Sequence, residues 1–247
     1  MEEVKPEKFG TRPRRLEKWL RRHGIAYFTG LWVVTCRAEV NNDPHQRYMI
    51  MTTGAKPECP KDLMDLATGE IPFIHVMLNE AEEKVWIHNC RNGKEGEMDF
   101  GGFKARIIEV TGCRYEESSA PGSQKAEPLS RFFRERMGKA FALTDLDFYL
   151  PGRKWFLEEK HFVRNGKAYL GKGQCRSLKE TVRDVFPGSD LWIVALSGKF
   201  FYLAGIKDTD CRRSRHIKGW GEMVETGTRA VNEEELEKFL RKTNSKD

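Results

Sequence analysis

One stretch of the chain, LTDLDFYLPGRKWFLEEKHF at residues 143–162, embeds acidic and basic side chains in apolar, strand-like sequence. Alternation along a strand puts Glu158 and Lys160 on one face, two residues apart. Asp145 and Asp147 share a face of the preceding strand, one tight turn earlier. If the two strands pair as a hairpin, an Asp and a Glu converge on one point with a Lys beside them.

Two convergent carboxylates suit a hard divalent cation such as Mg²⁺, with Mn²⁺ as the alternative, because these ions prefer oxygen ligands. A bound ion of this kind lowers the pKa of a water and offsets the charge that develops on a phosphate. An adjacent lysine would orient or help to activate the attacking water and stabilise the pentacovalent phosphate by its positive charge. The pattern therefore favours a site for metal-dependent phosphodiester hydrolysis.

The succession of Asp147, Glu158-x-Lys160 and a helix that opens with Gln174 resembles the PD-(D/E)XK, or restriction-endonuclease-like, nuclease superfamily. The resemblance covers roughly residues 127–206. It implies that Asp147 and Glu158 bind the metal, that Lys160 is the catalytic lysine, and that Gln174 matches a glutamine found in some members. It also implies an α/β (α+β) fold whose core is a mixed β-sheet flanked by helices.

The expected element order agrees with that family core. The elements are a helix at 128–141, a strand at 143–150, a strand at 155–163, a helix at 174–186 and a strand at 191–196. Two further acids belong to the candidate site. Asp145 competes with Asp147 for the aspartate role, and the resemblance implies that Glu135, on the first helix, matches an acidic residue that some members place near the metal. Leu146 stands where many members have a proline before the aspartate.

The plain alternative is an exposed strand that carries a Glu/Lys pair of little energetic value. A chain with 37 acidic and 43 basic residues contains such pairs by chance. The context favours the nuclease interpretation, because the charges lie in an apolar strand, an aspartate lies on the strand before, and a helix follows.

The rest of the chain predicts a second lobe. A basic amphipathic helix at 11–23 precedes an acidic, β-rich stretch in which 103–113 is predicted as a strand. Residues 115–127, rich in Ser, Pro and Gly, indicate a boundary. We therefore expect a recognition or dimerisation lobe at 1–118 and a nuclease domain at 119–247, ending in a helix capped by Asn232.

Charge is distributed unevenly, with net values of +4 over residues 1–24, −5 over 25–120, +6 over 121–206 and +1 over 207–247. Basic segments on either side of an acidic middle suit a polyanionic partner, although ordinary solvated surface explains them equally well. In the segment 211–220, predicted as a loop, basic residues lie beside Trp220. The candidate nucleic-acid contacts are Arg12, Arg14, Arg15, Lys172, Arg212, Arg213 and Arg215.

The composition argues against a membrane protein and against a secreted protein. No apolar run is long enough for a membrane helix, and the charged N-terminus does not predict a secretion signal, so we expect a cytoplasmic protein. The six cysteines show no zinc-site spacing and are expected to be reduced. The predicted partner is DNA, with RNA left open and a homodimer as one arrangement. The alternatives are a non-catalytic nucleic-acid-binding protein with the same fold and a module that binds an acidic protein.

Overall fold

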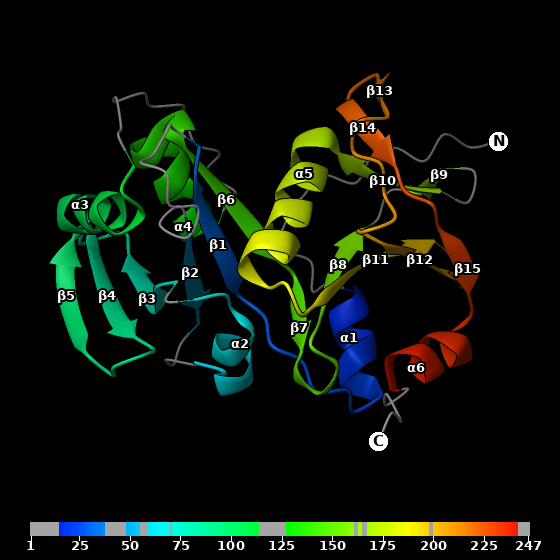
Figure 1. Cartoon of the computed structure of the whole chain (residues 1–247), viewed down its shortest axis with the longest axis horizontal. Helices are drawn as coiled ribbons and strands as arrows, with labels where there is room; N and C mark the ends of the chain where they lie inside the picture. Colours follow the sequence, from blue (N-terminus) through cyan, green and yellow to red (C-terminus); the bar gives the residue numbers. More distant parts are fainter. Residues whose placement is uncertain are drawn as a thin grey trace.

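The chain folds into a mixed α+β structure with three β-sheets (Figure 1). The structure is a computed structural model that describes residues 15–37, 48–54, 59–69, 71–113, 127–160, 163–164, 167–197 and 200–241. Of the predicted linker at 115–127, residues 115–126 lie outside these residues.

The first sheet contains six strands in the order β5-β4-β3-β2-β1-β6. All neighbouring pairs are antiparallel except β2 and β3, which are parallel. The elements of this region are β1 (Leu31–Cys36), β2 (Tyr48–Thr53), α2 (Lys61–Leu66), β3 (Phe73–Asn79), β4 (Lys84–Asn89), β5 (Glu95–Asp99), α3 (Phe100–Thr111), α4 (Pro128–Phe132) with the π-helical turn Phe133–Met137 and the 3-10 turn Gly138–Ala140, and β6 (Phe141–Leu146).

The predicted strand at 103–113 is wrong, because this segment forms most of α3. Asp99 caps the helix by accepting a hydrogen bond from the backbone N–H of Gly102. Gly112 ends it in the left-handed conformation, with φ of 60°. The side chains of Phe103 and Ile107 are buried one helical turn apart. The β-branched residues after the two glycines favoured a strand locally, but packing on the sheet decides the outcome.

The second sheet contains five strands in the order β15-β12-β11-β8-β7, and a smaller sheet has the order β13-β14-β10-β9. In the second sheet β8 and β11 run parallel, whereas the other pairs are antiparallel. The elements are β7 (Phe148–Leu150), the 3-10 turn Pro151–Arg153, β8 (Trp155–Lys160), β9 (Val163–Arg164), β10 (Lys167–Gly171), α5 (Lys172–Glu180) with the π-helical turn Thr181–Val185, β11 (Asp190–Ser197), β12 (Phe200–Gly205), β13 (Ser214–Ile217), β14 (Gly221–Glu225), β15 (Arg229–Val231) and α6 (Glu233–Arg241).

Three apolar layers form the core of the described residues, and one of them lies between the two large sheets. The layer between them contains side chains from β1 and β2, from β8 and β11, and from α5, with Val33, Phe156 and Leu178 among its members. The outer face of the first sheet is covered by α3 and α4. Because the two sheets share the middle layer, the predicted lobes have a common core.

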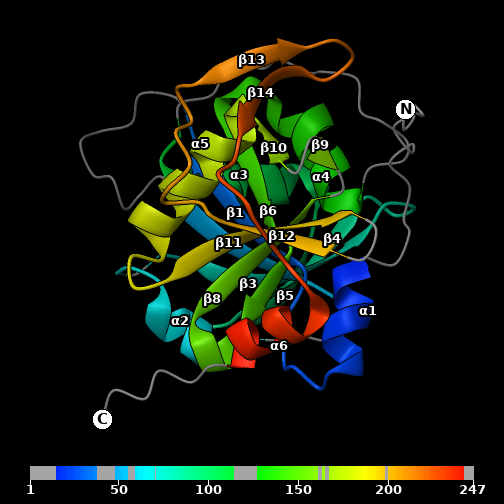
Figure 2. The same ribbon diagram turned by 90° about the vertical axis from the view of Figure 1, so that its right-hand side faces the viewer.

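The outer face of the second sheet is covered by α1 (Arg15–Arg22) and α6, which lie beside one another (Figure 2). Thus α1, which was expected to belong to the N-terminal lobe, packs on the second sheet through Leu16, Trp19 and Leu20. The helix that begins at Pro128, which was expected in the nuclease core, packs on the first sheet instead. Each helix follows its apolar face to the sheet that can bury it.

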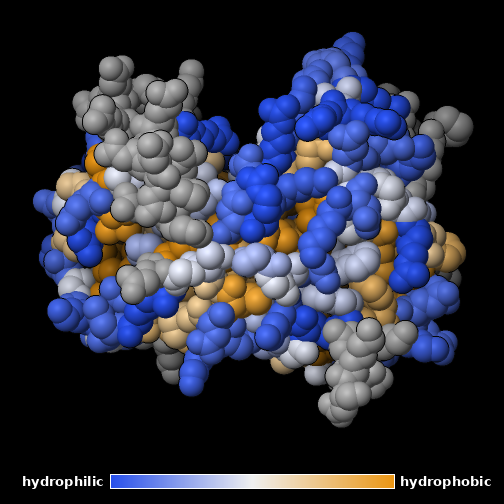
Figure 3. All heavy atoms as spheres, in the orientation of Figure 1, coloured by the Kyte–Doolittle hydropathy of each residue, from blue (hydrophilic) through white to orange (hydrophobic). Residues whose placement is uncertain are grey.

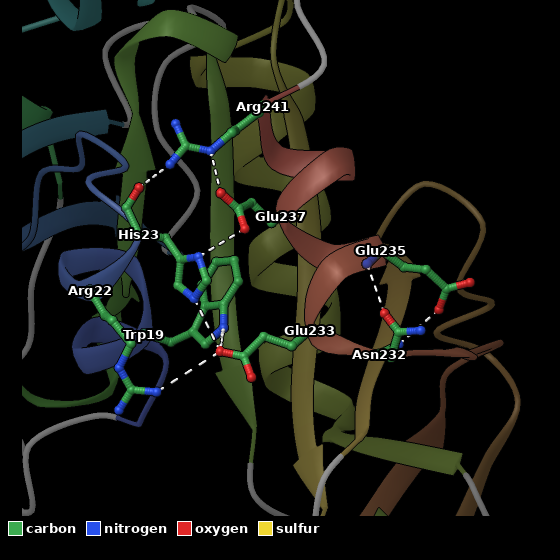
Figure 4. A network of polar contacts seen from close by, with 8 residues as sticks. All are labelled: Trp19, Arg22, His23, Asn232, Glu233, Glu235, Glu237 and Arg241. Atoms are coloured by element: carbon green, nitrogen blue, oxygen red, sulfur yellow. Dashed lines mark hydrogen bonds and ion pairs between the residues drawn. The ribbon is translucent and has the colours of Figure 1, made fainter.

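A polar network joins α1 to α6 (Figure 4). The imidazole of His23 is 3.0 Å from the carboxylate of Glu233 and 3.0 Å from that of Glu237. The predicted cap of α6 is confirmed, because Asn232 and Glu235 exchange side-chain-to-backbone hydrogen bonds of 2.8 and 2.9 Å.

All six cysteines form disulfides, so the expectation of reduced cysteines is wrong. The pairs are Cys36–Cys113, Cys59–Cys90 and Cys175–Cys211, with sequence separations of 77, 31 and 36 residues. Such long-range pairing leaves no local spacing to recognise. The argument for a cytoplasmic location that rested on reduced cysteines therefore falls away. Among the described helices, none has the length and apolar character needed to cross a membrane.

Candidate active site

The chain passes from the first sheet to the second at Asp147. The strand before it, β6, pairs with β1, whereas the strand after it, β7, pairs with β8. The register that sets Phe148 opposite Leu157, continued by one residue, sets Asp147 opposite Glu158. The Asp147 side chain is buried, and its Oδ2 accepts a 2.7 Å hydrogen bond from the backbone N–H of Glu159. The change of sheet therefore holds a carboxylate beside the end of β8.

Glu158 and Lys160 project from the same face of β8 and contact each other. Lys160 Nζ lies 2.5 Å from Glu158 Oε1. The side chain of Glu158 is 3% exposed and that of Lys160 is 20% exposed, so solvent reaches the pair from the lysine side. The structure thus brings Glu158 and Lys160 into direct contact, and it holds Asp147 at the backbone N–H of the residue between them.

Gln174 reaches the same carboxylate from α5. Its Nε2 donates a 2.7 Å hydrogen bond to Glu158 Oε1. The helix begins directly after β10 and buries Cys175 and Leu178, which turns its first residues toward β8. A contact of 2.7 Å between the hydroxyls of Ser177 and Thr144 ties α5 to β6 as well. Gln174 is therefore held by its own hydrogen bond to Glu158 on β8, and its helix is held by the contact of Ser177 with β6.

The electrostatic environment raises the pKa of Lys160 above its ordinary value. Burial is the largest single influence and lowers the pKa, but the combined attraction of Glu158, Asp147 and Asp145 exceeds it. Lys160 is therefore a cation at neutral pH. Asp145 is half-buried on β6 and contributes charge to the site, while Asp147 makes the direct contact with β8.

Glu135, the additional acid expected on the first core helix, does not join this cluster. It is exposed on the π-helical turn after α4. That turn packs against the outer face of the first sheet through Phe133 and Met137. The expectation for Glu135 is wrong because its helix belongs to a different layer.

The predicted nucleic-acid contacts that the structure describes lie in three regions: the start of α1, the start of α5 and the segment around β13. Arg15 begins α1, and Arg12 and Arg14 lie outside the described residues. Lys172 begins α5, with its Nζ 3.6 Å from Glu222 Oε2. Arg15 and Lys172 therefore lie on two different helices, α1 and α5.

The segment predicted as a loop at 211–220 forms β13 and its turn, which project from the body with β14 (Figure 2). Arg212 and Arg213 are exposed before β13, and Arg213 lies 3.2 Å from Asp210. Arg215 extends over the ring of Tyr169 at 4.9 Å. The hairpin thus presents exposed cations above the end of α5, which packs against β14.

Sequence reasoning missed Glu159, the residue between the two candidate catalytic residues of β8. Its side chain is buried on the opposite face of the sheet and accepts hydrogen bonds from the backbone N–H groups of Arg15 (3.0 Å) and Leu16 (3.2 Å). It caps the first turn of α1. Alternation along β8 predicts its face, but the sequence gives no sign of a partner 144 residues away.

The donor set suits a hard cation. Within the part of the chain that the structure describes, no cluster of three or more His, Cys, Asp or Glu residues is positioned to hold a metal. Asp147 and Glu158 supply two carboxylates, and Mg²⁺ commonly takes one or two from the protein and completes its shell with waters and phosphate oxygens. The types of donor present therefore fit Mg²⁺, which would need further ligands from outside the protein.

Comparisons of the chain with protein-family models, with curated proteins and with solved structures found no significant match.

Proposed function

We propose that the protein is a Mg²⁺-dependent nuclease that hydrolyses phosphodiester bonds of DNA, built on a core like that of the PD-(D/E)XK superfamily. The observation that carries the proposal is the convergence of Asp147, Glu158, Lys160 and Gln174 from three separate elements. The residue types and their spacing in the sequence favour the same chemistry. Burying such charges is costly, which favours a chemical role for them.

The protein's own residues have distinct roles in this proposal. Asp147 and Glu158 would hold the ion, which would supply Lewis acidity that lowers the pKa of a water and offsets charge on the phosphate. Lys160, as a cation, would donate a hydrogen bond to the attacking water and stabilise the developing negative charge. Gln174 would position Glu158 by holding its Oε1. In this step the oxygen of water would form a bond to phosphorus as one ester P–O bond breaks. The attacking water would lose a proton to solvent, and the leaving oxygen would take up a proton from solvent to depart as a hydroxyl group.

The exposed basic residues would hold the nucleic acid. Arg212, Arg213 and Arg215 on the β13 segment, with Lys172 and Arg15, would contact phosphates without reading sequence. The first sheet would supply recognition or the contacts of a homodimer, since one site cuts one strand of a duplex.

A non-catalytic nucleic-acid-binding protein is the second candidate. The ion pair between Lys160 and Glu158 favours it, because the lysine already neutralises the carboxylate within the protein. In that case the basic hairpin would bind nucleic acid and the buried cluster would only support the fold.

The test measures cleavage of plasmid, linear duplex, single-stranded DNA and RNA in Mg²⁺, Mn²⁺ or EDTA. We expect DNA cleavage that requires the metal and is abolished in Asp147→Ala and Lys160→Ala. Thermal unfolding of each variant checks that it is folded. Cleavage that survives EDTA or either substitution would exclude the mechanism, and salt-dependent binding without cleavage of any substrate would favour the binding protein.

A further inference from the structure

A row of cations follows one side of α5 away from the candidate active site. Lys172, Arg176, Lys179 and Arg183 recur at intervals of four, three and four residues, which places them on one helical face. Hydrophilic side chains cover α5 on the face turned to the viewer in Figure 3. The row spans about 16 Å at 1.5 Å per residue, beginning beside Gln174.

The acidic residues of the same helix lie beside this row. At 100° per residue, Glu180 is offset from Arg176 by about 40° and borders the row, whereas Asp184 is offset from Arg183 by about 100°. Arg183 contacts Asp184 with 2.5 and 2.7 Å hydrogen bonds, and Lys172 is 3.6 Å from Glu222. Exposed pairs of this kind contribute little free energy, so a phosphate can replace the carboxylate partner.

A pocket of about 450 Å³ lies at the far end of the row. Its lining combines the cations Lys179, Arg183 and Lys207 with apolar residues, Val182, Pro187 and Ile206. Lys179 donates a 3.2 Å hydrogen bond to the backbone carbonyl of Lys207, which joins the two sides of the pocket. Cations around an apolar lining suit a ligand with both an anionic and an apolar part.

We propose that α5 guides an unpaired strand of nucleic acid from the active site to this pocket. The phosphates would contact the row of cations, and one nucleotide would place its base against Pro187, the exposed apolar residue of the lining, since Val182 and Ile206 are only 3% and 0% exposed. A paired duplex keeps its bases stacked inside the helix, so it cannot fill the pocket without flipping a base out. The proposal rests on the proposed function and specifies its substrate as nucleic acid with unpaired nucleotides next to the scissile phosphate.

The test measures binding of the full chain in EDTA, so that cleavage plays no part. The probes are a fluorescently labelled DNA single strand and the same strand in a blunt duplex, each titrated over a range of salt concentrations. We expect the single strand to bind at least about tenfold more tightly. In the double variant Arg176→Gln with Lys179→Gln, its slope of log affinity against log salt should fall by about 1.4, because each lost phosphate contact contributes roughly 0.7.

The matched control removes one lysine and one arginine from a helix of the first sheet, Lys104→Gln with Arg106→Gln on α3. It should leave both affinities unchanged. The variant Pro187→Asp tests the pocket separately, because it adds a negative charge to an exposed lining residue. We expect it to weaken single-strand binding and spare duplex binding, with thermal unfolding as the check on folding.

Equal affinity for both probes, or an unchanged salt slope in the α5 variant, would overturn the inference. A cleavage assay run in parallel distinguishes the two proposals. Metal-dependent cleavage with an unaffected α5 variant would refute the strand path alone. Single-strand binding that depends on α5, without cleavage of any substrate, would refute the nuclease and keep the strand path.

Discussion

The two large sheets differ in how far their charged side chains are exposed to solvent. On the first sheet, ion pairs such as Lys84 with Glu97 are exposed, with the two side chains 46% and 57% accessible. On the second sheet, Asp147, Glu158 and Glu159 are buried within two adjacent strands. Among the described residues these three are the buried carboxylates. An exposed pair costs the fold little, whereas a buried charge needs compensation from its surroundings.

The buried glutamates Glu158 and Glu159 differ in the groups that compensate their charges. Glu159 is compensated by two backbone N–H groups of α1, and this accounts for it structurally. Glu158 is compensated by two side chains, those of Lys160 and Gln174, rather than by backbone groups. We therefore expect variants of Glu158 to affect activity most and variants of Glu159 to affect stability most.

The largest effect is expected from a comparison of Glu158→Gln with Glu97→Gln. Each substitution removes one charge from a glutamate in a strand. Loss of the Glu158 charge should reduce the rate of DNA cleavage by about 10⁴-fold, because it removes a metal ligand and the partner of Lys160. The exposed Glu97 should tolerate the change. Initial rates in Mg²⁺ measure both, and comparable rates in the two variants would remove the distinction between the sheets.

The next comparison removes one disulfide from each region. Cys36→Ser with Cys113→Ser should lower the free energy of unfolding by about 4.5 kcal/mol, and Cys175→Ser with Cys211→Ser by about 4 kcal/mol, from the lengths of the closed loops. Urea unfolding measures both values. Cys175 follows Gln174 directly, so the second variant should also slow cleavage under conditions where it remains folded. Equal activity in both variants would show that the disulfide does not position Gln174.

Glu159→Ala should cost about 2 kcal/mol of unfolding free energy, because two N–H groups of α1 lose their acceptor. Glu159→Gln keeps an acceptor and should recover part of the loss. Chemical denaturation measures the stability of both variants, and the cleavage rate should fall far less than in Glu158→Gln. A loss of activity as large as that of Glu158→Gln would place Glu159 among the catalytic residues.

The smallest effect concerns pH. Hydrogen bonds with His23 and Trp19 lower the pKa of Glu233, and those with Arg241 and His23 lower the pKa of Glu237. A lowered pKa contributes stability above the ordinary glutamate value of about 4.3, and that stability is lost as pH falls through the folded-state pKa. Attachment of α6 to α1 should weaken only below about pH 4. Trp19 fluorescence follows it, and Glu233→Gln with Glu237→Gln should remove the dependence.

Local sequence signals predicted much of the second sheet and its site. Alternation placed Glu158 and Lys160 on one face, and the apolar spacing of α5 placed Gln174 at the start of a helix. The capping box at Asn232 was predicted for the same reason, because both partners lie within four residues.

Features that depend on distant partners were not predicted. The burial of Glu159 depends on α1, more than 140 residues away, and the disulfides join residues 31 to 77 apart. Asp145 lies in β6 and Asp147 just after it, but no local pattern shows that the chain changes sheets there. The prediction of a strand at 103–113 was wrong because it relied on the β-branched residues. The helix caps at Asp99 and Gly112 were the better signal of structure.

The packing of α1 against α6 limits the order in which parts of the fold can form during translation. Trp19 and its hydrogen-bond partner Glu233 are 214 residues apart. At about 5–20 residues per second, roughly 10–40 s separate the appearance of the two helices during translation. The apolar layer beneath β8 is therefore completed last, after the sheet that carries Asp147 and Glu158 has already emerged. A chain that stops before α6 leaves this layer without Leu236 and Leu240.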